Sequence, residues 1–442
     1  MRTSDSVARV TQRRESAIPS PVEGAHLAGL QRRTLLVLSL AQVLAGFGLA
    51  AGITVGALLA AELWGSTAAA GLPAVLFTLG AAGASIVIAR VSSARGRRVG
   101  LTVGYVAGAL GGLGIVIAAT ESLPVLLIVA FVIYGAGSAA NLQARFAGAD
   151  LAVPSHRARA MSLVLMATTL GAVLGPLSAQ LMGRVAEGWG LDALVGPFVL
   201  SAFAYVAGAL VLGFYLRPDP LLVARANDAP AAASGGGPGA QPAGTDAHDT
   251  AWRRPVAGGI VVMVGAQLVM IAVMTMTPVQ MRLHDHAVGT IGLVIALHVA
   301  AMYVPSPLSG YLVDRLGPWW VAGASAAVLG LAGLVSALAD PTATATMTVG
   351  LVLLGLGWSL GMISGSAIVT AAAPLRVRAR VQGRSDALIS VAGAGGAGAS
   401  GVIMAMAGFS ALALGCAAAA LALGALAVAY GRERKAGTMA AS

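Results

Sequence analysis

The sequence predicts an all-α protein that crosses a membrane many times. Of its 442 residues, 57% are hydrophobic and only 10% are charged, and the mean hydropathy is +0.85. A soluble domain of this length carries about 25% charged residues. Apolar runs long enough to cross about 30 Å of hydrocarbon recur along the chain. These observations exclude a soluble globular fold and predict twelve transmembrane helices.

The predicted spans form two groups of six, separated by a polar linker. Residues 1–33 are polar and rich in arginine, and 217–255 is rich in Gly, Pro and polar residues, so we expect both to be disordered. We expect six-helix bundles at 34–216 and 256–430 and a second tail at 431–442. The spans are 34–60, 67–91, 99–119, 123–147, 158–182, 194–216, 256–281, 287–312, 318–338, 344–370, 379–407 and 409–430.

The positions of the basic residues predict the orientation. The net charge is +10, but the loops that would lie outside contain only Arg184 and Arg282. Positive residues concentrate on the cytoplasmic side of membrane proteins. We therefore expect a plasma-membrane protein with both termini and the 217–255 linker in the cytoplasm. We expect the lipid bilayer to surround the spans and a small solute to be transported, and we do not expect the protein to bind nucleic acid.

The two groups of spans repeat one another. Gly96 and Gly317, Arg157 and Arg378, and Gly175 and Gly396 are each separated by 221 residues. A parallel repeat of six plus six spans with a long central connection is a layout found in secondary transporters. The sequence therefore predicts two pseudo-equivalent bundles.

Two short segments resemble the loop between the second and third helices of the major facilitator superfamily. The second-half copy is Gly310-Tyr-Leu-Val-Asp314-Arg315-Leu-Gly317, and the first-half copy keeps Gly96, Arg97 and Arg98. The first copy has Ser93 where the family has an aspartate. The resemblance implies an alternating-access transporter with a gate on the cytoplasmic side, and a charged gate is better supported in the second half than in the first.

The fifth predicted span contains Gly171-Ala-Val-Leu-Gly175-Pro176. This segment resembles a signature of drug antiporters, but Ala179-Gln180 replaces the usual glycine pair. Small residues also allow two helices to approach closely, and a proline bends a helix. We interpret the segment as a close-packing site.

Two methionine motifs lie on the seventh and eighth spans: Met270-Ile-Ala-Val-Met274 and His298-Val-Ala-Ala-Met302. Each pair has i, i+4 spacing, which places both side chains on one helix face. The pair of motifs resembles that of the copper importers that supply cytochrome oxidase assembly. Thioether sulfur and imidazole nitrogen suit copper(I), so the resemblance implies a metal-binding set for a transported copper ion. The alternative is that these methionines only fill space in apolar helices. Below Met302, Pro305 and Pro307 are expected to distort the helix.

Several polar side chains lie on spans that line the central cavity in this superfamily. They could line such a cavity or make hydrogen bonds between helices, and the second is the default. Charged residues near the predicted inner ends, Arg145, Asp150 and Asp386, are expected to pair, to reach the interface or to join the gate. No Asp or Glu is expected near the middle of a span. The cavity candidates are Gln42, Asn141, Gln143, Ser364 and Ser366.

The expected function is a secondary transporter that imports copper by alternating access, with copper as substrate and no cofactor. The alternative is a transporter of a small organic molecule, either a drug or metabolite exporter or a vitamin importer. A membrane sensor would require a soluble sensory domain. An enzyme is not expected, because no nucleophile–base set or phosphate loop occurs. We expect the protein to act as a monomer.

Overall fold

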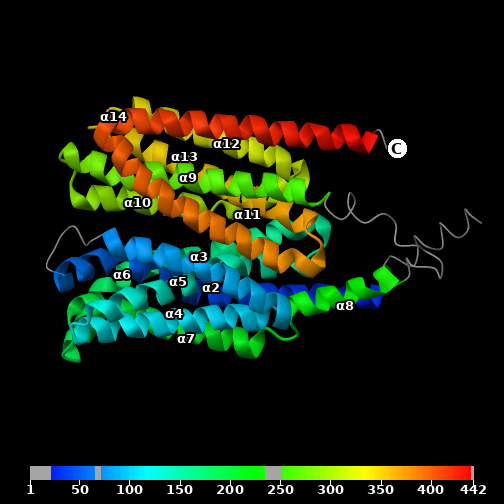
Figure 1. The fold of residues 1–442 in the computed structure, drawn as a ribbon, viewed down its shortest axis with the longest axis horizontal. Coiled ribbons are helices and arrows are strands. Elements are labelled where there is room, and N and C mark those ends of the chain that lie inside the picture. Colours follow the sequence, from blue (N-terminus) through cyan, green and yellow to red (C-terminus); the bar gives the residue numbers. More distant parts are fainter. Residues whose placement is uncertain (1–20, 65–70, 234–250, 440–442) are drawn as a thin grey trace, which may run out of the picture.

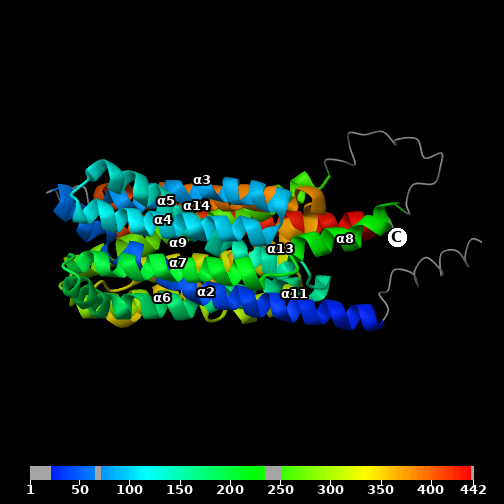
Figure 2. The same ribbon diagram turned by 90° about the horizontal axis from the view of Figure 1, so that it is seen from below.

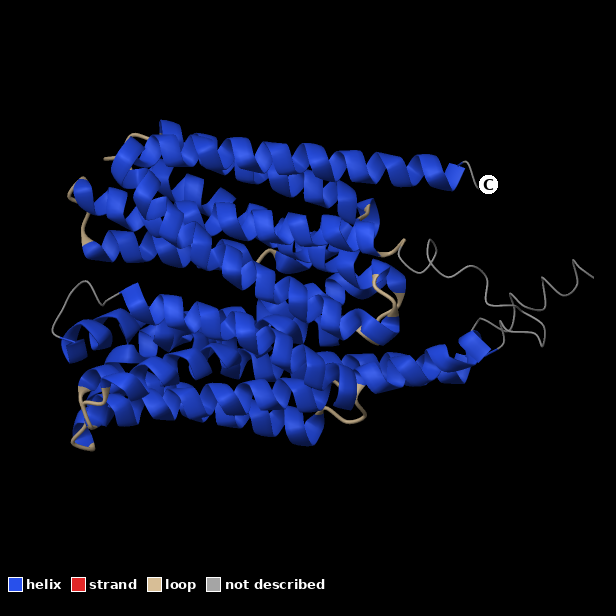
Figure 3. Cartoon of the chain, in the orientation of Figure 1, coloured by secondary structure: helices blue, strands red, loops and turns tan. Residues whose placement is uncertain are grey.

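The computed structural model describes residues 21–64, 71–233 and 251–439, which form helices with short connections and no strand (Figure 3). The all-α prediction is confirmed. The helices of the first half are α2 (Pro21–Trp64), α3 (Leu72–Arg95), α4 (Arg97–Thr120), α5 (Pro124–Ala149), α6 (Arg157–Gly188) and α7 (Gly196–Tyr215). Those that follow are α8 (Pro220–Ala233), α9 (Arg253–Leu283), α10 (Val288–Tyr303), α11 (Ser306–Leu316), α12 (Pro318–Leu338), α13 (Thr344–Ala372) and α14 (Leu375–Met439).

Ten segments of the described chain are long and apolar enough to cross a membrane. Most coincide with predicted spans within a few residues; for example, the span predicted at 318–338 is α12. The last two predicted spans both fall in α14, which contains a break at Gly408, where φ is +82°. Only glycine adopts this backbone conformation without strain. The chain can therefore reverse at Gly408, as the prediction of two spans requires.

The eighth predicted span, 287–312, is interrupted. Helix α10 ends at Tyr303, and α11 begins at Ser306. Pro305 precedes α11, and Pro307 lies in its first turn, where a missing N–H costs no hydrogen bond. The predicted distortion below Met302 is confirmed.

The predicted disorder of the linker is wrong for residues 220–233, which form helix α8. The first tail was expected to end at residue 33, but α2 already begins at Pro21. The second tail was expected from residue 431, but α14 continues to Met439. Residues 1–20, 65–70, 234–250 and 440–442 lie outside the described part of the chain.

Each half has its own hydrophobic core. The first core is built from α2 to α7 and includes Leu38, Tyr105 and Phe198, whereas the second is built mainly from α9 to α14 and includes Val269, Leu354 and Met362. Figure 1 shows the two halves side by side, and in Figure 2, which is seen from below, the first half lies in front of the second. Between the halves, α3 packs against α14 and α6 packs against α11.

Both turns that resemble the superfamily loop lie at the same end of the molecule. We call this end the termini side; it contains the start of α2, the turn at 93–98 and the turn at 314–318. Gly96 and Gly317 have φ values of +93° and +90°, respectively, and each separates two helices. Glycine is needed at these positions because other residues are strained in this conformation.

Candidate functional site

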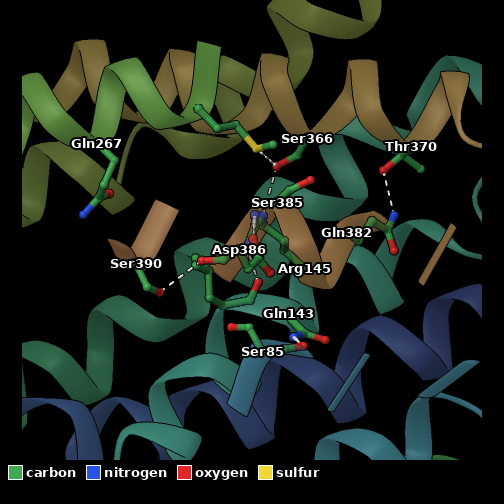
Figure 4. Close-up of polar contacts among 12 residues, drawn as sticks. Ser85, Gln143, Arg145, Gln267, Ser366, Thr370, Gln382, Ser385, Asp386 and Ser390 are labelled. Carbon is green, nitrogen blue, oxygen red and sulfur yellow. Dashed lines mark hydrogen bonds and ion pairs between the residues drawn. The ribbon is translucent and has the colours of Figure 1, made fainter. Parts of the chain in front are cut away.

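The interface between the halves contains a buried ion pair. Arg145 of α5 donates from Nη2 to Oδ1 of Asp386 on α14 at 2.6 Å, and both side chains are fully buried (Figure 4). Arg145 also donates from Nε to Ser366 Oγ of α13 at 3.0 Å and from Nη1 to the carbonyl oxygen of Leu142. One arginine of the first half therefore contacts two helices of the second.

A second buried arginine lies at the start of α4. Arg97 pairs with Asp150 of α5, with 2.8 Å between Nε and Oδ2, and both side chains are fully buried. Its Nη2 also donates to Gln382 Oε1 of α14, and Gln382 donates to Thr370 Oγ1 at 3.0 Å. Arg97, which the sequence placed at the gate, thus also links the halves.

The gate residues of the second half make a different contact. Asp314 of α11 accepts hydrogen bonds from the backbone N–H groups of Ala158 and Arg159 at 3.0 and 3.1 Å. It caps the start of α6, where a carboxylate is favoured by the helix dipole. Arg159 Nε lies 3.5 Å from the carboxylate. Arg315 does not pair with Asp314; it donates to the hydroxyl of Tyr311.

Glycines allow close approach along both contacts between the halves. A Cβ atom on Gly310 of α11 would meet Ser162 and Ala158 of α6. A Cβ atom on Gly383 of α14 would meet Ala89 and Ser85 of α3. Both helix pairs on the termini side are therefore in backbone contact.

The glycine segment of the fifth span lies within the first half. A Cβ atom on Gly171 of α6 would meet Val43 and Gly46 of α2. Gly175 is buried in the same helix, and Pro176 lies there too, although its side chain is outside the described part. This arrangement agrees with the close-packing interpretation.

Among the cavity candidates, Gln42 hydrogen-bonds Asn141, Thr168 and Tyr105 of three other helices, at 2.7 to 3.1 Å. Gln143 donates to the carbonyl oxygen of Ser85 at 2.8 Å. Such hydrogen bonds between helices are the default reading of polar residues in a span. Ser366 binds Arg145, as described above, Ser364 donates to Gly361 in its own helix, and Asn141 Nδ2 is without a partner in the described residues.

The structure places the four methionine-motif residues in or against the second-half core. Met270, Met302 and His298 are buried, and Met274 is half-buried. His298 Nδ1 lies 2.7 Å from the carbonyl oxygen of Leu351 on α13, and its Nε2 has no partner among the described residues. Helix α10 packs mainly against α13 and contacts α9, which carries Met270 and Met274, only lightly.

No group of three or more His, Cys, Asp or Glu side chains that could hold a metal ion occurs in the described ranges. These four residue types do not include methionine, so the observation does not test a thioether site. The set of three thioethers and one imidazole remains a prediction.

Sequence reasoning missed an amide and two aromatic side chains in the second half. The indole N–H of Trp358 on α13 donates to Gln267 Oε1 of α9 at 2.7 Å. Tyr303 of α10 meets the Trp358 ring edge to face, with 5.7 Å between ring centroids. Trp358 is buried, and Tyr303 and Gln267 are partly exposed. We call Gln267, Tyr303 and Trp358 the aromatic–amide group.

A signal for this group was present in the sequence, because a tryptophan and a glutamine within apolar spans are unusual.

Asp386 was predicted as a gate residue, but its pairing with Arg145 was not predicted. It lies about 16 Å along α14 from Leu375, at 1.5 Å per residue, and is fully buried. In Figure 4, Gln267 and Ser390 lie on the same side of the Arg145–Asp386 pair.

Comparison with known proteins agrees with this architecture. A family model described as Major Facilitator Superfamily matches residues 38–287 and 260–441. The chain is 46% identical over 340 residues to the uncharacterized MFS-type transporter YdeG of Bacillus subtilis, covering 77% of this chain and 78% of the relative. It is 29% identical over 353 residues to the riboflavin transporter RfnT of Brucella anthropi, covering 77% and 81%, respectively.

Among solved structures, the proton:xylose symporter XylE superposes with a TM-score of 0.72, covering 92% of this chain and 96% of that chain. The sequence identity is 15%, so this likeness concerns the fold alone. Together with the two packed halves, the family match and the YdeG relative establish that the chain belongs to the major facilitator superfamily and is a multi-pass membrane transporter.

Proposed function

We propose that this transporter moves a small organic solute across the plasma membrane by alternating access. The observation that carries the proposal is the aromatic–amide group, which brings together side chains of α9, α10 and α13. Two aromatic rings provide surfaces for an apolar or aromatic solute, and Gln267 provides a hydrogen-bonding amide. Sites for small molecules combine these features: mostly apolar walls with a few polar groups that fix orientation.

The network between the halves supports alternating access. The ion pair Arg145–Asp386, the Arg97–Gln382 hydrogen bond and the Asp314 cap all lie on the termini side. A transporter closed at one end by such contacts exchanges states when the halves rock about the central site.

The relatives also support an organic solute. RfnT is named as a riboflavin transporter, and it aligns with more than three quarters of both chains. Riboflavin has a flat ring system with hydrogen-bonding edges, which suits aromatic side chains and an amide. This chemistry makes riboflavin the first probe to use.

Copper is the second candidate, and one observation favours it. The buried Nε2 of His298 has no partner in the described chain, and it is in the same half as three buried or half-buried methionines. An imidazole nitrogen and thioethers would suit copper(I). The relatives lend copper no support, so we rank it below an organic solute.

Uptake of labelled riboflavin and of labelled copper, at matched membrane abundance, tests the proposal. Gln267→Ala removes the amide and should lower riboflavin uptake about tenfold, as expected for one lost solute hydrogen bond. Gln280→Ala changes the same residue type on the same helix, outside the group, and is the control. Met270→Leu nearly conserves volume and should leave riboflavin uptake unchanged.

Copper becomes the better reading if the parent takes up copper but not riboflavin, and if Met270→Leu and His298→Leu abolish that uptake. The rest of the proposal follows the sequence: both termini and the termini side face the cytoplasm, no cofactor takes part, and the protein acts as a monomer.

A further inference from the structure

Helix α8 is fixed to the bundle by one aspartate at its start. Asp219 accepts hydrogen bonds with Oδ1 from the backbone N–H groups of Leu221 and Leu222, at 3.0 and 3.2 Å. Leu221 is fully buried against the first half. A helix of 14 residues is marginal in water by itself, so these tertiary contacts explain why α8 forms in a polar linker.

The same carboxylate also caps a second helix. Oδ2 of Asp219 accepts a hydrogen bond from the backbone N–H of Arg98, in the first turn of α4, at 2.7 Å. The carboxylate occupies the space where a Cβ atom on Gly96 would lie. Two helix N-termini therefore meet one negative charge, which is favourable for both helix dipoles.

Arg225, one turn and a half along α8, contacts the other side of the same turn. Its Nη1 donates to the carbonyl oxygen of Ser93, in the last turn of α3, at 2.7 Å. A basic side chain is favourable at a helix C-terminus, where carbonyl groups lack partners. Asp219 and Arg225 together hold the 93–98 turn from both ends, and we call this arrangement the α8 clasp.

The repeat shows that the first-half turn lacks an acidic residue of its own at the position of Asp314. Asp314 and Ser93 are separated by the repeat offset of 221 residues, so they are pseudo-equivalent. The carboxylate of Asp314, in the second-half turn, caps the start of α6, whereas Ser93 brings no charge to the first-half turn. The carboxylate at the first-half turn comes from Asp219 in the linker instead.

The clasp is connected to the contacts between the halves. Arg98, which Asp219 holds, directly follows Arg97, whose side chain binds Asp150 and Gln382. Loss of the clasp would free the first turn of α4 and with it the Arg97–Gln382 hydrogen bond.

We propose that α8 is part of the gate, and that Asp219 is a positioning residue that keeps the termini side closed by holding the 93–98 turn. The proposal rests on the proposed alternating access. In the absence of the Asp219 carboxylate, the state open on the termini side becomes more populated.

The test measures gate opening without a solute. Ser385, fully buried in the layer between the halves, is replaced by cysteine (Ser385→Cys) in a Cys416→Ala background. Maleimide labelling of this cysteine is followed in the full chain in membranes whose termini side is accessible. Asp219→Asn should raise the labelling rate about fivefold, the size expected for loss of a cap. Asp219→Glu, which keeps the charge, should restore slow labelling.

Asp192→Asn is the matched control, because Asp192 also accepts a backbone hydrogen bond, from Leu194 at 2.6 Å, but at the opposite end of the molecule. It should leave the labelling rate unchanged. Arg225→Gln is the second variant, and it is used if Asp219→Asn does not accumulate in the membrane. It should also raise the labelling rate.

Two results separate the clasp from the proposed function. If Arg145→Gln raises labelling but neither clasp variant does, the clasp is refuted and alternating access stands. If Arg145→Gln also leaves labelling unchanged, the closed gate itself is refuted, and the clasp with it.

Discussion

Arg145 joins the halves through side-chain contacts that no local pattern could predict. Its partner Asp386 is 241 residues away, and Ser366 is 221 residues away. From the sequence, Arg145 and Asp150 were expected either to form ion pairs or to reach the membrane interface. Because they are only five residues apart, they would be expected to pair with each other. The structure instead pairs Arg145 with Asp386 and Arg97 with Asp150. Both arginines lie where the two halves meet, so their partners depend on helices that are far apart in the sequence.

The buried pair gives a prediction that distinguishes interaction from burial. Arg145→Gln or Asp386→Asn alone leaves one buried charge without its partner, which costs about 3–5 kcal/mol. The double variant removes both charges and should be more stable than either single variant. The measurement is the midpoint of thermal unfolding of the purified protein in detergent.

Arg384→Gln is the control for that comparison, because Arg384 is exposed on the same helix, two residues before Asp386. Its unfolding midpoint should match that of the parent. Additive losses in the double variant would mean that the two side chains contribute independently and that their pairing does not stabilise the closed gate.

At the scale of elements, the apolar runs predicted where helices lie, and the turns predicted where two of them meet. Gly96 and Gly317 were recognisable because a positive φ between two apolar runs selects glycine. Helix α8 was missed because its sequence lacks a long apolar face. Its stability comes from the Asp219 hydrogen bonds and the buried Leu221, which depend on the folded bundle.

The close contacts of α3 with α14 and of α6 with α11 were also hidden. The glycine of the α6–α11 contact is Gly310 on α11, and that of the α3–α14 contact is Gly383 on α14. In the repeat, α11 corresponds to α3 and the start of α14 corresponds to α6, so the two glycines lie on helices that are not equivalent. Gly383 has no counterpart in the superfamily segment used to recognise Gly310. A search restricted to one motif therefore finds half of the interface.

The asymmetry between Asp314 and Ser93 predicts different local stability in the two halves. Asp314→Ala removes the acceptor for the N–H groups of Ala158 and Arg159, so these amides should exchange with deuterium about fivefold faster. Ser93→Ala should leave exchange in the first turn of α14 unchanged, because Ser93 provides no carboxylate there. Hydrogen exchange followed by mass spectrometry of the full chain measures both, and faster exchange at α14 in Ser93→Ala would contradict the asymmetry.

At the scale of the whole molecule, the repeat and the hydropathy predicted the architecture, whereas the solute site depends on which side chains the fold brings together. The methionine motifs were visible because their spacing is local. The aromatic–amide group comes from α9, α10 and α13, and its members are far apart in sequence. Local spacing therefore favoured copper, and the assembled structure together with the relatives favours an organic solute.

The arginine distribution makes a prediction about the orientation of the entire molecule. His284 follows α9 at the end opposite the termini side, and Ser234 belongs to the linker after α8. With positive residues concentrated on the cytoplasmic side, His284 should face outward and Ser234 inward. In the Cys416→Ala background, a membrane-impermeant maleimide should label the His284→Cys variant in intact cells and the Ser234→Cys variant only in inverted vesicles. Reversed labelling would place the closed gate and the α8 clasp on the outer face of the membrane.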